Sequence, residues 1–211
     1  MTLQNNIIAL QRSPVRQKIE QRLDEFSSFG SKSSKEWFSE LCFCLLTANS
    51  KAKTALAIQA QLGPHGFCNA THEDVRRCII DNKHRFHNNK ASFIIEARQY
   101  LDIKEKVQGL IKDNGEQGAR EWLVKNIKGL GLKEASHFLR NTGAQDLAIV
   151  DRHIMNLMVE NKMLKEKPKS VARKSYFEIE CTLRDLASKL NMSLAELDMY
   201  MWYMKTGEVL K

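Results

Sequence analysis

The sequence predicts an all-α protein, and three features of the 211-residue chain lead to that prediction. Apolar residues recur at intervals of three and four along most of the chain, which is the spacing of one buried helix face. No stretch alternates apolar and polar residues with the period of two that marks a half-buried strand. Hydrophobic residues make up 43% of the composition, enough to fill a sizeable interior. We therefore expect about ten short helices and no sheet.

Local signals at the ends of the apolar segments set the expected helix boundaries. Gly63-Pro64 ends one helix, because glycine favours the C-terminal cap and proline does not continue a helix. Thr71 opens the next helix as an N-cap, and Ser193 with Glu196 forms a capping box. The segments expected to be helical are Glu36–Ala48, Lys51–Leu62, the stretch from Thr71 through Ile80, Lys90–Val107, Glu116–Ile127, the segment after Asp151, Ser175–Leu190 and Ser193–Met204.

The segment Asn126–Ala135, NIKGLGLKEA, predicts a tight turn between two helices that can hold a phosphate. Gly129 and Gly131 lack a Cβ and can adopt positive φ, so the backbone can approach a partner closely. The N–H groups at the start of the second helix carry the positive end of its dipole. An ordinary helix–helix turn usually needs one glycine. The pair, with basic neighbours such as Lys128, therefore favours a DNA-binding turn over a purely structural one.

Charge and composition bound the class of partner and the location. Lys and Arg number 33 against 25 Asp and Glu, which gives a formal net charge of +8. Such an excess attracts polyanions such as DNA, although by itself it leaves DNA and other partners equally open. No apolar run reaches the roughly 18 residues of a membrane span, and the first residues lack the features of a signal peptide. We expect a cytoplasmic, nucleoid-associated protein with no membrane partner.

The cysteines and histidines predict no metal site. The five cysteines are an odd number without C-x-x-C spacing, so they suggest neither a disulfide framework nor zinc, and we expect them to be small buried residues. His84 and His87 lie three residues apart without an obvious third ligand.

Several segments together resemble the helix-hairpin-helix superfamily of DNA glycosylases. The main ones are Gly129-Leu130-Gly131-Leu132-Lys133-Glu134-Ala135 and, eighteen positions after Lys133, Asp151 within Ile149–His153. Leu45–Ser50 and Arg85–Ala91 are also similar to segments of that superfamily. The length and the ending from Trp202 to Lys211 most resemble the type 2 8-oxoguanine DNA glycosylase/lyases. The loop before Asp151 departs from the superfamily's pattern, because it lacks the proline found there. No cysteine follows Cys181, which argues against the iron–sulfur endonuclease III branch.

The resemblance implies two helical lobes with a DNA-binding cleft between them. Residues 32–143 would form a six-helix lobe that ends in the helix-hairpin-helix motif, and residues 1–31 with 144–211 would form the second lobe. The expected partner is double-stranded DNA containing 8-oxoguanine, bound by a monomer.

The resemblance also assigns the chemistry to Lys133 and Asp151. A neutral lysine amine can displace the damaged base from the sugar and form a Schiff base, and both burial and a helix N-terminus favour the neutral amine. A carboxylate at Asp151 would stabilise the positive charge that develops, while also serving as the N-cap that an aspartate there commonly is. Loss of a 2′ proton would then eliminate the 3′ phosphate. These steps require no metal and no organic cofactor.

Further residues are assigned to base and DNA recognition by the same resemblance. Trp202 and Phe86 would stack on the flipped base, and Lys211, with its terminal carboxylate, would help to recognise it. Asn49 would fill the gap opposite the unpaired cytosine, while Lys128, Gly129 and Gly131 would hold the backbone. From the residues alone, Trp202 is a core residue, Lys211 a frayed end and Asn49 equally a helix-terminating residue.

Two alternatives remain open at the level of sequence. One is a glycosylase/lyase for another oxidised base. The other is a non-catalytic helix-hairpin-helix protein that only grips DNA, which explains the glycines and the charge but gives Lys133 and Asp151 no role.

Overall fold

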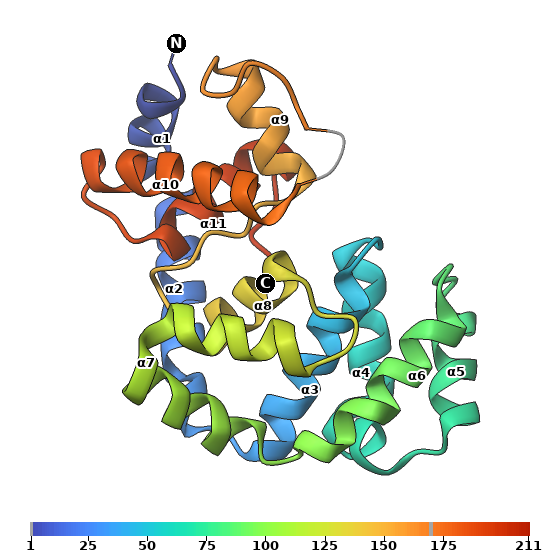
Figure 1. Ribbon diagram of the computed structural model, residues 1–211. Helices are drawn as coiled ribbons and strands as arrows, with labels where there is room; N and C mark the ends of the chain where they lie inside the picture. The colour runs from blue at the N-terminus through green and yellow to red at the C-terminus, as the bar shows by residue number, and fades with distance from the viewer. Residues whose placement is uncertain (1, 169–170) are drawn as a thin grey trace. The chain divides into compact units, whose positions relative to one another are not determined.

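A computed structural model describes residues 2–168 and 171–211, and its regular structure is helical throughout these ranges (Figure 1). No strand occurs in the described residues, so the all-α prediction is confirmed. The chain separates into two compact units. We call Gly30–Thr142 the hairpin unit, and the chain up to Phe29 together with Gly143–Lys211 the terminal unit.

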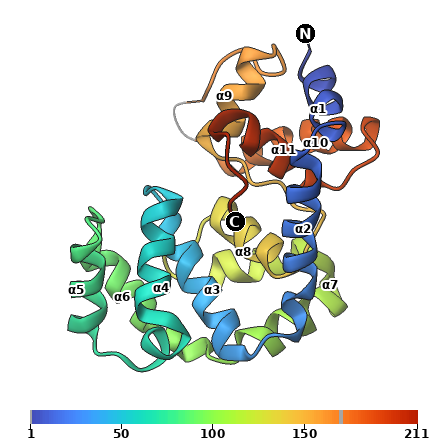
Figure 2. The same cartoon turned by 180° about the vertical axis from the view of Figure 1, so that it is seen from behind.

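The hairpin unit is built around one helix, α3, whose residues from Trp37 to Thr47 are all buried. The helix has almost no polar face, which is the pattern of a helix surrounded by others. Its neighbours lie on several sides in both views (Figures 1 and 2). The helices of this unit are α3 (Ser34–Thr47), α4 (Ala52–Asn69), α5 (His72–Asp81), α6 (His87–Ala97), α7 (Ile103–Asn126) and α8 (Leu132–Asn141).

A buried carboxylate ties three of these helices together. Glu40 of α3 accepts a hydrogen bond of 2.6 Å from the Asn141 side chain of α8 and one of 3.2 Å from the Gln59 side chain of α4. A buried charge requires such partners, because its transfer out of water is costly. The bonds therefore fix the far end of α8 on the central helix.

The terminal unit gathers around α11, which contacts α1, α2, α9 and α10. Ser193 caps α11 by accepting from the Glu196 N–H at 3.1 Å, which is the serine half of the predicted capping box. The helices of this unit are α1 (Leu3–Gln11), α2 (Val15–Ser28), α9 (Arg152–Glu160), α10 (Arg173–Lys189) and α11 (Leu194–Thr206).

Some expected boundaries were wrong. The helix predicted over Lys90–Val107 ends at Ala97, passes through a 3₁₀ turn at Arg98–Tyr100, and gives way to α7 at Ile103. Arg98 donates to the carbonyls of Phe67 and Ala70 at the end of α4, a long-range anchor that local periodicity does not reveal. Gly63 does leave the helical conformation, with φ of 60°, but helical turns resume after it as far as Asn69.

Two further predictions from the sequence concern the burial of the cysteines and the absence of a membrane span. Four of the five cysteines are buried, but Cys181 is exposed, contrary to expectation. Among the described residues, no helix combines the length and the apolar character needed to cross a bilayer.

Candidate active site

The turn that joins α7 to α8 is closely packed at Gly129. Its φ is +89°, a conformation that side chains disfavour, and a Cβ there would lie 2.3 Å from Cδ2 of Phe93 on α6. Gly131, by contrast, has φ of −94° and extended backbone, so only one of the two glycines takes the positive φ expected of this motif. The turn is therefore pressed directly against the ring of Phe93.

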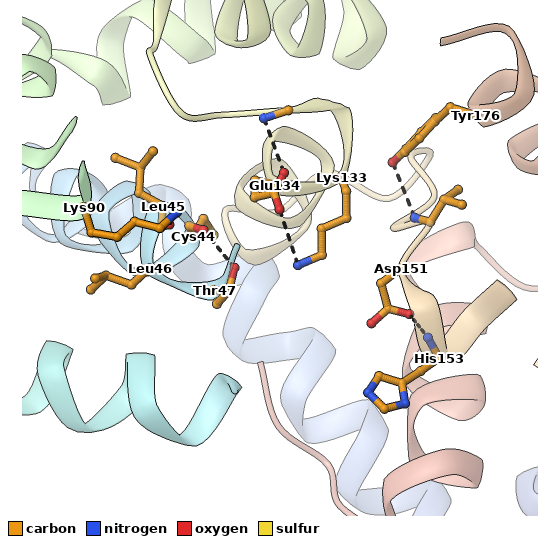
Figure 3. Close-up of polar contacts among 12 residues, drawn as sticks. Cys44, Leu45, Leu46, Thr47, Lys90, Lys133, Glu134, Asp151, His153 and Tyr176 are labelled. Carbon is orange, nitrogen blue, oxygen red and sulfur yellow. Dashed lines mark hydrogen bonds and ion pairs between the residues drawn. The ribbon is translucent and has the colours of Figure 1, made fainter. Parts of the chain in front are cut away.

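Lys133 is the second residue of α8, and its side chain is 25% exposed. Its Nζ lies 3.9 Å from Oε1 of Glu134 (Figure 3). The first N–H groups of a helix have no acceptor within the helix, so the start of α8 carries the positive end of the helix dipole beside this amine. The structure thus places a partly exposed amine at the positive end of a helix.

Glu134 was not singled out from the sequence. Its Oε2 accepts from the Gly131 N–H at 3.3 Å and so caps α8 from the third helical position. A glutamate three residues after an N-cap is a known capping signal and could have revealed it. The carboxylate fixes the first turn of the helix that carries Lys133.

Lys128 is 64% exposed and its Nζ pairs with Glu96 at 3.0 Å. The same Nζ lies 5.9 Å from the centroid of the Phe93 ring. Exposed ion pairs contribute little free energy, so this lysine can exchange its partner for a phosphate at small cost.

Asn49 and Phe86 both lie exposed at helix ends of the hairpin unit. Asn49 follows α3 with φ of 60°, the left-handed conformation that Asn tolerates after a helix. Phe86 precedes α6, is 40% exposed, and has the Arg85 guanidinium 5.4 Å from its ring centroid. The predicted helix-terminating geometry of Asn49 is thus present, and it leaves the amide accessible.

Asp151 caps α9 in the terminal unit. Its Oδ1 accepts from the His153 N–H at 2.8 Å (Figure 3) and from the Ile154 N–H, also at 2.8 Å. The N-cap predicted for this aspartate is confirmed. Since one oxygen accepts both bonds, the carboxylate is held in one orientation and Oδ2 points away from the cap.

The extended segment before Asp151 is held by α10, which sequence reasoning missed. Tyr176 Oη donates to the Ala148 carbonyl at 2.7 Å and accepts from the Val150 N–H at 3.4 Å. Glu180 accepts from the Ala148 N–H at 3.0 Å. The signal was present in Leu147–Val150, because a buried apolar segment outside a sheet must find other partners for its backbone.

Trp202 on α11 stands against the helix that Asp151 caps. Its ring meets His153 edge-on, with centroids 5.2 Å apart and an interplanar angle of 80°. Its Nε1 is buried and has no acceptor among residues 2–168 and 171–211. Trp202 is half-buried rather than a full core residue, and Lys211 is also half-buried. His153, two residues after Asp151, was not anticipated.

The predicted site residues divide between the two units. Lys133, Lys128, Gly129, Gly131, Asn49 and Phe86 belong to the hairpin unit, and Asp151, Trp202 and Lys211 to the terminal unit. No group of three or more His, Cys, Asp or Glu side chains suited to a metal ion occurs within the described ranges.

Comparison with known proteins decides the family. A family model described as 8-oxoguanine DNA glycosylase matches residues 19–192. The chain is 46% identical to the 8-oxoguanine DNA glycosylase/AP lyase of Methanocaldococcus jannaschii, with both chains covered completely. It is 43% identical to that of Korarchaeum cryptofilum, covering 99% of this chain and 98% of the other. This chain belongs to the 8-oxoguanine DNA glycosylase family.

Solved structures of the 8-oxoguanine DNA glycosylase family agree with this assignment. The Methanocaldococcus jannaschii glycosylase/lyase in complex with a 15mer DNA containing 8-oxoguanine has a TM-score of 0.96, with 45% identity and complete coverage of both chains. The Thermotoga maritima 8-oxoguanine DNA glycosylase has a TM-score of 0.90 at 37% identity, covering 99% of this chain and 98% of that one. The family predicted from the sequence is confirmed.

The family model covers some of the candidate residues and not others. Lys133 and Asp151 lie inside the residues 19–192 that the 8-oxoguanine DNA glycosylase model covers, whereas Trp202 and Lys211 lie beyond them. The last two are nevertheless included in the full-length match to the Methanocaldococcus jannaschii relative.

The packing at the turn yields a stability prediction. Gly129→Ala should destabilise the hairpin unit by about 2–4 kcal/mol, because the methyl group would collide with Phe93 and the backbone would be strained. Gly131→Ala is the matched control and should cost about 1 kcal/mol or less, since its backbone is extended. Chemical denaturation followed by circular dichroism measures both. Equal losses would show that contact with Phe93 does not constrain the turn.

Proposed function

We propose that this chain excises 8-oxoguanine from double-stranded DNA and then nicks the strand, with Lys133 as the nucleophile. The observation that carries the proposal is the position of Lys133 in a member of this family. Its amine is partly exposed at the start of α8, directly after a turn whose backbone is suited to a phosphate. We further propose that the protein acts as a monomer at the nucleoid, where its substrate lies.

The reaction begins with a flipped nucleotide, since a base inside the duplex is out of reach. The neutral amine of Lys133 attacks C1′, and the bond from C1′ to the base breaks with its electron pair leaving on the base, which takes up a proton. Opening of the sugar ring gives a protonated Schiff base between Lys133 and C1′. Removal of a proton from C2′ then expels the 3′ phosphate by β-elimination, which nicks the strand.

Asp151 would stabilise the positive charge that grows on the sugar as the base departs. The support for this role is its geometry: two short bonds to Oδ1 hold the carboxylate rigid, and Oδ2 is not used by the cap. A fixed carboxylate stabilises charge without the cost of reorienting in the transition state.

Recognition of the base falls to the aromatic and terminal residues in this proposal. Trp202 and Phe86 would stack on 8-oxoguanine, and Lys211 would bind its edge. N7 of this lesion is a donor and N7 of guanine an acceptor, so an acceptor in the pocket would discriminate by about 1–3 kcal/mol. Asn49 would fill the vacated stack, since its amide offers both a donor and an acceptor to cytosine.

Contact with the strand is assigned to the turn. The backbone at Gly129 and Gly131 would approach a phosphate closely, and Lys128 would exchange Glu96 for that phosphate.

The nucleophile is tested by borohydride trapping on duplexes that carry 8-oxoguanine, thymine glycol or an abasic site. Wild type should form a covalent adduct with 8-oxoguanine DNA, and Lys133→Gln should form none, because its amide does not make a Schiff base. Lys128→Gln is the matched control and should still be trapped. An adduct of equal yield in Lys133→Gln would contradict the assignment. Preferential trapping on thymine glycol would instead favour a different oxidised base.

The role of Asp151 is tested with Asp151→Asn, which keeps an oxygen able to accept both cap bonds but loses the charge. The free energy of unfolding should change by about 1 kcal/mol or less, because Asn is also a good N-cap. Single-turnover excision of 8-oxoguanine should slow by a factor of about 100 or more. An excision rate equal to that of wild type would leave Asp151 with the cap as its only role.

A further inference from the structure

The C-terminal end of α3 is closed by side chains from elsewhere in the hairpin unit. The last four carbonyls of a helix lack partners within it. Here Thr47 Oγ1 donates to the Cys44 carbonyl at 2.8 Å, and the Ser50 N–H donates to the Thr47 carbonyl at 3.1 Å. The carbonyls of Leu45 and Leu46, which lie between these two, accept hydrogen bonds from residues far along the chain.

Lys90 of α6 donates from Nζ to the Leu45 carbonyl at 2.6 Å (Figure 3). Its side chain is buried, with 5% of the residue exposed, and burial lowers the pKa of Lys90 to about 8. A lysine at this place suits the negative end of the α3 dipole. Its amine is therefore committed to the helix end rather than presented to solvent.

His84, which is 3% exposed, bonds the remaining carbonyl, that of Leu46. Its Nε2 lies 2.9 Å from the Leu46 oxygen, and its Nδ1 lies 3.2 Å from the Phe86 backbone nitrogen. A carbonyl only accepts and a backbone N–H only donates, so Nε2 carries the proton and Nδ1 carries the lone pair. Both bonds exist together only in this neutral tautomer. Burial lowers the pKa of His84, which favours the neutral ring.

The two bonds of His84 join the segments of two candidate DNA contacts. Leu46 is three residues before Asn49, and the bonded N–H belongs to Phe86 itself. Asn49 is exposed in a left-handed conformation, and Phe86 is exposed before α6, so neither is held by a core of its own. We propose that His84 is a positioning residue that holds Asn49 and Phe86 in a fixed relation for DNA binding. This inference rests on the DNA contacts assigned to those two residues in the proposed function.

Two conservative variants separate the bonds of His84. In His84→Gln the side-chain nitrogen takes the place of Nε2, so the donor to the Leu46 carbonyl is kept and the acceptor for the Phe86 N–H is lost. In His84→Asn the side-chain oxygen takes the place of Nδ1, so the acceptor is kept and the donor is lost. His84→Ala removes both.

Val107→Ala serves as the stability control. Val107 is buried on α7, two residues after Glu105, which bonds Ser34 at the opposite end of α3. This substitution should loosen the hairpin unit by creating a cavity, while the bonds to the Leu45 and Leu46 carbonyls stay in place.

The readout is the dissociation constant, at fixed salt, for a duplex with 2′-fluoro-8-oxoguanosine opposite cytosine, an analogue that keeps the base on which Phe86 would stack but resists excision. His84→Ala should weaken binding by about tenfold, and Val107→Ala by less than about twofold. In double-mutant cycles, the effect of His84→Ala should not add to that of Asn49→Ala or Phe86→Ala. The reason is that His84→Ala would already have displaced the DNA contacts that these two substitutions remove. In the His84→Gln background, Asn49→Ala should keep its wild-type cost while Phe86→Ala costs little. The His84→Asn background should show the reverse.

Additive cycles for both partners would overturn the proposal, and so would Asn49→Ala and Phe86→Ala variants that bind like wild type. Equal weakening by Val107→Ala and His84→Ala would also overturn it, since that result would reduce His84 to a stabilising residue. A different result would overturn the proposed function. In that case the wild-type protein would bind the analogue but would not excise 8-oxoguanine.

Discussion

The close packing of the Gly129 backbone against the ring of Phe93 is the constraint on which the candidate site of the hairpin unit depends. There is no room for a Cβ between them, so the turn before α8 has one position on α6. The same α6 carries Lys90, which closes the end of α3 ahead of Asn49. One helix therefore sets the place of the turn proposed to bind phosphate, of the start of α8 and of the exposed loop after α3. The residues assigned to DNA on this unit share a single rigid support.

Two lysines near this support show how environment separates their roles. Lys90 is buried and gives its amine to a helix carbonyl, whereas Lys133 keeps a quarter of its side chain exposed beside the first turn of α8. A nucleophile must be reached by its substrate, so burial excludes Lys90 even though burial lowers its pKa. In the terminal unit, too, the surroundings of a side chain determine what it can do. Asp151 receives its orientation from cap bonds, and the segment before it receives its own from Tyr176 and Glu180.

Much of this architecture could be predicted from the sequence, because local physics decides it. The helical periodicity, the caps at Thr71, Ser193 and Asp151, and the family resemblance all rest on neighbouring residues. The break between α6 and α7 could not be predicted, since Arg98, which lies in it, bonds carbonyls about thirty residues away in sequence. Of the candidate site, Gly129 was recognisable from the glycine pattern of the turn, and Lys133 and Asp151 from the resemblance to the helix-hairpin-helix glycosylases. His84, Lys90, Tyr176 and Glu180 were not, because each acts through a backbone group of a distant segment.

In the proposed reaction the partly exposed amine of Lys133 at the start of α8, and no other amine, attacks the sugar. The most direct measurement is mass spectrometry of the borohydride-reduced adduct with 8-oxoguanine DNA after proteolysis, which identifies the residue joined to the sugar. The residue joined to the sugar should be Lys133, with Lys90, Lys128 and Lys125, which lies in the last turn of α7, unmodified. A sugar remnant on any of those three lysines, with Lys133 unmodified, would contradict it.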